Sequence, residues 1–75
     1  MRTDIYFCFK NKEDDGFYVA AETRNRARSM FADETGHRYA DVRSNIARRG
    51  VVCAEKVFTE NTPQLARFGL GYREE

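Results

Sequence analysis

The sequence predicts a small α+β domain, in which a three-stranded antiparallel sheet carries helices packed mainly on one face. Three observations lead to this prediction: alternating apolar residues near the N-terminus, a capped helical pattern after them, and a later β-branched run. The chain has 75 residues, 41% of them hydrophobic and 33% charged, and includes six Phe and four Tyr. This length and composition fit one folded domain over residues 1–75.

The first part of the chain is expected to form a β-hairpin. Residues 3–10 alternate between two apolar sides, and residues 17–21 resume the alternation after a polar loop that ends at Gly16. We expect Tyr6 and Tyr18 to line the sheet face that the helices leave uncovered. Either the C-terminal helix folds over this face, or the face stays open as an interface, for which a homodimer is the functional alternative.

The segment after the hairpin carries start and stop signals of a helix. Thr23 is a suitable N-cap, apolar residues follow at helical spacing, and Gly36 stands where a left-handed residue ends a helix. These signals predict a helix over residues 24–35. For residues 39–49 the apolar spacing and the glycine stop at Gly50 favour a second helix, while an alternating pattern keeps a strand as the competitor.

The last third of the chain predicts one strand and one short helix. Residues 51–58 are β-branched and short, which suits a third strand added to the hairpin. Thr62 and Pro63 form a cap followed by proline at the first helical position, and Gly69 follows the apolar residues of this helix.

The charge is unevenly distributed. Residues 24–49 carry seven arginines against three carboxylates and no lysine, although the whole chain has a net charge of only +1. Arginine presents a planar fork that binds carboxylates and phosphates. We therefore expect partner binding by five arginines of this region: Arg24, Arg28, Arg43, Arg48 and Arg49. The alternative is that Arg24 and Arg28 pair internally with Glu22, with Glu34 or with the acidic loop at residues 13–15.

No grouping of residues in the sequence indicates catalysis, a metal or a cofactor. His37 is the single histidine and has no partner at zinc-ligand spacing, and Cys8 and Cys53 are expected to be reduced thiols in the core. Apolar runs are too short for a membrane span. We expect a non-enzymatic protein of the cytoplasm that needs no cofactor.

Two short motifs carry a resemblance. The motif Ala21-Glu22-Thr23-Arg24-x-x-Ala27-Arg28 and the later Tyr39-x-Asp41-Val42-Arg43 resemble small uncharacterised proteins encoded by bacteriophages and prophages. The resemblance covers about residues 5–43, carries no catalytic residues, and includes a second segment that is strand-like. It implies a phage accessory protein that acts in the cytoplasm of a bacterial host cell by binding a host or phage protein.

These observations predict a binding protein with a protein partner, and inhibition of a host defence or host enzyme is its specific version. The alternative is a nucleic-acid-binding regulator that uses the central arginines. Against the alternative stand the net charge of +1, the sequence pI of about 7.8 and the scarcity of aromatic residues among the arginines, where Tyr39 is the candidate for base stacking.

Overall fold

The protein has an α+β fold built on one antiparallel sheet of four strands. The computed structural model describes residues 2–12 and 16–73. In chain order the elements are β1 (Arg2–Phe9), β2 (Phe17–Ala21), α1 (Arg24–Thr35), a short 3-10 turn η2 (Tyr39–Asp41), β3 (Arg43–Val52), β4 (Lys56–Phe58) and α2 (Pro63–Arg67). The strand order is β3-β1-β2-β4, with every neighbour antiparallel. The predicted fold class is confirmed, with one strand more than expected.

The expected hairpin is confirmed, but its register differs from the one we assumed. Phe7 lies opposite Tyr18, and Tyr6 lies opposite Val19. Opposite residues of an antiparallel pair point to the same face, and successive residues point to opposite faces. Tyr6 and Tyr18 therefore lie on opposite faces of the sheet, and the expectation that they share one open face is wrong.

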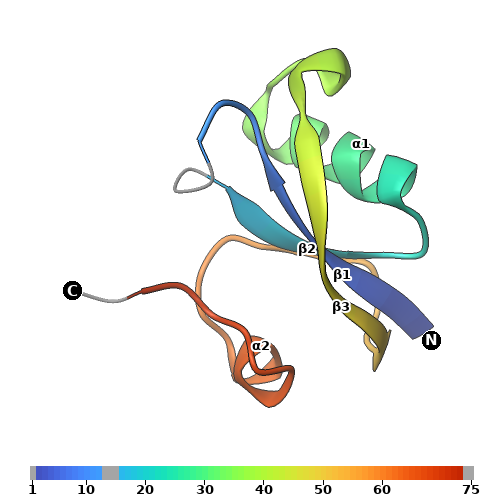
Figure 1. The fold of residues 1–75 in the computed structure, drawn as a ribbon, viewed down its shortest axis with the longest axis vertical. Helices are drawn as coiled ribbons and strands as arrows, with labels where there is room; N and C mark the ends of the chain where they lie inside the picture. The colour runs from blue at the N-terminus through green and yellow to red at the C-terminus, as the bar shows by residue number, and fades with distance from the viewer. Residues whose placement is uncertain (1, 13–15, 74–75) are drawn as a thin grey trace.

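Each face of the sheet has its own small core. On the first face α1 covers a cluster that includes Tyr6, Cys8, Val19 and Phe31. In Figure 1, α1 lies to one side of β3, and α2 lies near the opposite end of the sheet.

The second face is covered in part by the C-terminal segment. Leu65 of α2 is fully buried with Ile5 and Phe58, and Phe68 and Leu70 pack against this cluster. Of the two alternatives for the second face, the structure shows the one in which the C-terminal segment folds over it.

Local signals placed α1 correctly. The Thr23 hydroxyl accepts a hydrogen bond from the backbone N–H of Arg26 (3.1 Å), as an N-cap does. At the other end Gly36 has a φ of 76°, and its N–H donates to the carbonyl of Ala32 (2.8 Å). The predicted helix over 24–35 is therefore confirmed at both ends.

The predicted helix over 39–49 is wrong, because most of that segment belongs to strand β3. Gly50 does have a positive φ of 65°, but it lies inside the strand rather than after a helix. The pairing of β3 with β1 shifts register on both sides of Ile5, so β3 is bulged there. Asp4 stabilises the irregular backbone, since its Oδ1 accepts a hydrogen bond from the Gly50 N–H (2.8 Å).

The predicted strand over 51–58 is divided between two elements. β3 ends at Val52, and β4 begins at Lys56 on the other edge of the sheet. The final helix is confirmed, with Thr62 as N-cap and Pro63 at its start.

Candidate functional site

Arg24 and Arg28 of α1 bind backbone carbonyls of the chain that leads into β3. Arg24 donates to the carbonyl of Ser44 (3.0 Å), and Arg28 donates to the carbonyls of Val42 (3.0 Å) and Tyr39 (3.3 Å). The Arg28 guanidinium also lies 4.5 Å from the centre of the Tyr39 ring, in a cation–π contact. The two arginines are one helical turn apart and their main targets are two residues apart on an extended chain. They therefore brace α1 against the edge strand β3.

The expected internal pairing with Glu22 or Glu34 is not what the structure shows. The one ion pair within residues 2–12 and 16–73 joins Arg26 to Glu55 (3.3 Å), and Glu55 also accepts from the backbone N–H of Glu22 (3.2 Å). The acidic loop at residues 13–15 lies outside the described residues. Because Arg24 and Arg28 direct their donors to carbonyls of their own chain, we assign them a bracing role and leave them out of the surface proposed below.

The three arginines of β3 are Arg43, Arg48 and Arg49, and all three are exposed. No carboxylate in the described part of the chain forms an ion pair with Arg43, Arg48 or Arg49. Val52, at the end of the same strand, is 74% exposed. We call these four residues the β3 surface.

The five predicted arginines do not form one cluster. Arg43 lies opposite Phe9 and Arg48 opposite Ile5, so both belong to the second face of the sheet. Burial raises the pKa of the Tyr6 hydroxyl on the first face, and Arg49 lies close enough for its charge to act in the opposite direction. The five predicted arginines thus form three groups: the bracing pair of α1, Arg43 and Arg48 on the second face, and Arg49 near the first face.

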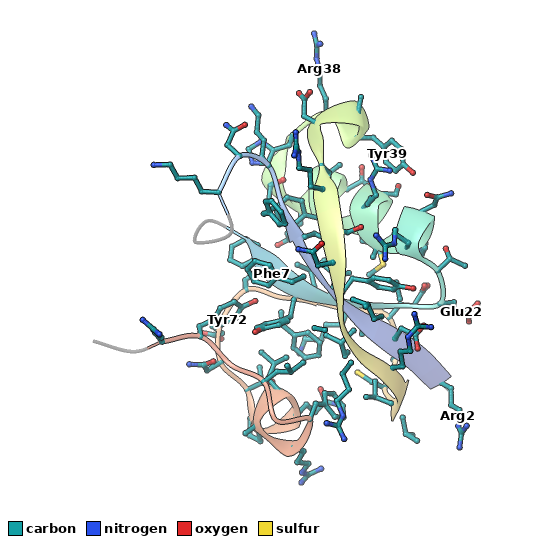
Figure 2. The ribbon with its side chains drawn as sticks, in the orientation of Figure 1. Arg2, Phe7, Glu22, Arg38, Tyr39 and Tyr72 are labelled. Atoms are coloured by element: carbon teal, nitrogen blue, oxygen red, sulfur yellow. The ribbon has the colours of Figure 1, made fainter. Side chains whose placement is uncertain are left out.

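An aromatic row on the second face was missed by the sequence analysis. The ring centroid of Phe7 lies 6.2 Å from that of Phe9 and 5.0 Å from that of Tyr18, and the Tyr18 centroid lies 5.1 Å from that of Tyr72. All four side chains are partly exposed, and Phe7 and Phe9 pack into neither core cluster. Figure 2 shows Phe7 and Tyr72 on the same side of the sheet, with Tyr39 on the side of α1.

The row follows from the hairpin register rather than from composition. The rings of β1 and β2 meet because Phe7 and Tyr18 are opposite each other. Gly16 permits the approach, since a Cβ there would lie 2.7 Å from the Phe7 ring and would also contact the Cys8 carbonyl. The sequence would have revealed this row only if the hairpin register had been assigned correctly.

Neither thiol has the character of a nucleophile. Burial raises the pKa of Cys8 to about 12, although the charges of Arg28 and Arg24 act in the opposite direction. Burial also raises the pKa of Cys53. The thiolate is the reactive form, so both cysteines are protonated and inert at neutral pH.

The rest of the described chain shows neither a metal centre nor a membrane segment. Among residues 2–12 and 16–73, no three or more His, Cys, Asp or Glu side chains are grouped as metal ligands would be. His37 instead places its ring 5.9 Å from that of Phe31. Within the same residues, no helix combines the length and the apolar character needed to cross a bilayer.

No protein-family model matches the chain, no curated protein matches its sequence, and no solved structure matches its fold. The β3 surface and the aromatic row are the candidate binding surfaces of the described residues.

Proposed function

We propose that the protein is a non-enzymatic binding protein that docks a protein partner through the β3 surface. One observation carries the proposal: three exposed arginines that form no ion pair within residues 2–12 and 16–73 lie with an exposed valine on a single edge strand. Arginine is enriched at protein interfaces, where its fork forms bidentate bonds with carboxylates. A partner that presents acidic residues would neutralise these charges, which form no ion pair within the described residues.

The remaining described features support binding rather than chemistry. The two cysteines are buried, and the bracing arginines are engaged with the backbone. The resemblance of the Ala-Glu-Thr-Arg and Tyr-x-Asp-Val-Arg motifs to phage-encoded proteins motivates the specific version of the proposal. In that version the partner is a host defence protein or a host enzyme, which this protein inhibits in the cytoplasm of the bacterium.

Affinity capture from a bacterial lysate tests the proposal. The bait is the wild-type protein, compared with an Arg43→Glu/Arg48→Glu/Arg49→Glu variant. We expect a partner that the wild type retains and that the variant loses by about tenfold or more, because charge reversal at an interface replaces attraction with repulsion.

The matched control reverses three exposed arginines outside β3, in an Arg38→Glu/Arg67→Glu/Arg73→Glu variant. This variant changes the net charge equally and should retain the partner. Circular dichroism and thermal unfolding establish that both variants fold. Equal capture by all three baits, or equal loss from both variants, would contradict a role for the β3 surface.

A further inference from the structure

The aromatic row on the second face is a surface that the proposed protein interface does not require. Phe7, Phe9, Tyr18 and Tyr72 follow one another at centroid distances between 5.0 and 6.2 Å. Tyr18 and Tyr72 also pack against the buried cluster of the second face, whereas Phe7 and Phe9 are partly exposed and pack against neither core cluster. We infer that this row, with Arg43 beside it, binds single-stranded nucleic acid by base stacking.

The row occupies the part of the sheet best suited to stacking. Phe7 and Phe9 lie on β1 and Tyr18 on β2, and these are the two central strands of the order β3-β1-β2-β4. α1 covers the opposite face. On the second face the cluster under α2 is packed against by Tyr18 and Tyr72 but not by Phe7 or Phe9, so among the described residues the β1 end of the row lies outside both cores. Aromatic residues on central strands of a four-stranded sheet are an established means of stacking unpaired bases.

Two residues of β3 provide a charged group and a polar group beside the row, where a bound strand would place its phosphates and base edges. Arg43 lies opposite Phe9 and Asn45 lies opposite Phe7, so both point to the face of the row. Both are exposed, and Arg43 forms no ion pair within the described residues. The guanidinium complements a phosphate, and the amide complements a base edge. Bases in a duplex are stacked on one another, so a row of this kind selects single strands.

The net charge sets the strength of this interaction. A chain with a net charge of +1 has few cations to neutralise phosphates. We therefore expect weak binding, with a Kd on the order of 10⁻⁵ M at low salt, in which stacking contributes more than charge. The shortage of aromatic residues among the arginines of the sequence does not count against this, because the register brings Phe9 beside Arg43.

Fluorescence anisotropy with a labelled oligothymidine of about 12 nucleotides at about 50 mM salt tests the inference. We expect binding of the single strand, and roughly tenfold weaker binding of an abasic strand of the same length, which keeps the phosphates but has no bases to stack. A Phe7→Leu/Phe9→Leu variant, which keeps apolar side chains and removes the rings, should lose affinity by about tenfold. An Arg43→Ala variant should reduce the salt dependence by about one phosphate contact.

Tyr39→Leu is the matched control, because it removes a 41%-exposed ring on the other side of the sheet and should leave oligonucleotide binding unchanged. Equal affinity for the normal and abasic strands would overturn the inference, as would undiminished binding by the folded Phe7→Leu/Phe9→Leu variant. Absence of oligonucleotide binding, combined with loss of a captured protein from that variant, would assign the row to a protein interface. The β3 surface shares only Arg43 with this site, and the two tests differ in readout, since one measures protein capture by charge-reversed baits and the other measures oligonucleotide binding by variants that lack the rings.

Discussion

At the scale of single residues, Tyr72 fastens the C-terminal segment to the sheet. Its hydroxyl donates to the carbonyl of Phe58 on β4 (2.5 Å) and accepts from the N–H of Tyr18 on β2 (2.6 Å). Asn61 holds its backbone from the other side, through bonds to the Tyr72 carbonyl (3.0 Å) and N–H (2.6 Å). Burial raises the pKa of Tyr72 to about 12, which keeps the donor proton in place.

We predict that the protein loses stability at alkaline pH. The unfolded chain releases the Cys8 proton near pH 9.0 and the Tyr72 proton near pH 10.0, whereas the folded chain holds both until about 12. Above pH 9 the unfolded state therefore binds fewer protons than the native state, so the free energy of unfolding falls as pH rises toward 12. Urea denaturation at a series of pH values measures this loss.

The Tyr72→Phe variant separates the contribution of this hydroxyl from that of the Cys8 thiol. At neutral pH it should lower the free energy of unfolding by about 1–2 kcal/mol, because it leaves the Tyr18 N–H and Phe58 carbonyl without this partner. Above pH 10 its loss of stability should be shallower than that of the wild type. Parallel curves for the two proteins would refute the assignment.

At the scale of elements, capping signals were sufficient to predict the ends of α1, but the pairing of the strands could not be predicted. Thr23 and Gly36 act within one or two turns of the chain, so the sequence around them determines the helix ends. Gly50 has the same local character, yet its positive φ serves a bulge whose existence depends on β1. The faces of Tyr6 and Tyr18 depend on the hairpin register, and a shift of one residue exchanges the two faces of a strand.

The difference between local signals and long-range contacts also explains which features of the candidate site could be predicted from the sequence. Exposure of Arg43 and Arg48 was predictable from their charge. The bonds of Arg24 and Arg28 depend on where α1 meets β3, which no local pattern encodes.

The bracing of α1 against β3 predicts a stability role for Arg28. The Arg28→Ala variant should lose about 1–2 kcal/mol, because two hydrogen bonds to carbonyls and the contact with Tyr39 disappear together. Arg28→Lys should restore only part of the loss, since an ammonium lacks the planar fork that reaches both carbonyls. Chemical denaturation of both variants measures the difference, with Arg38→Ala as an exposed control expected to change stability by less than about 0.5 kcal/mol. A wild-type midpoint for Arg28→Ala would show that the brace adds nothing.

At the scale of the whole molecule, the protein depends on two small cores separated by one sheet. A chain of this size has little surplus burial, so neither cluster is expected to sustain the fold alone. Deletion of residues 68–75 would remove Phe68, Leu70 and Tyr72 and uncover Ile5 and Phe58.

We predict that this deletion abolishes cooperative thermal unfolding. Deletion of residues 73–75 alone keeps all three of those side chains and should leave the transition intact. Calorimetry on the two truncated proteins distinguishes the outcomes, and a cooperative transition in the shorter one would show that the α1 face is sufficient.

The strand order has a further consequence for how the chain acquires its fold. β1 pairs with β2 nearby in sequence and with β3, which begins only at Arg43. On the ribosome the β1–β2 hairpin and α1 are therefore complete before the strand that closes the other edge of β1 has been synthesised. We expect the late docking of β3 to limit the folding rate, because distant pairings require the costlier loop closure. Pulse-labelled hydrogen exchange would then show that the hairpin amides are protected before the amides between β1 and β3. Until β3 docks, the free edge of β1 is an apolar strand edge that chaperones or neighbouring nascent chains can bind.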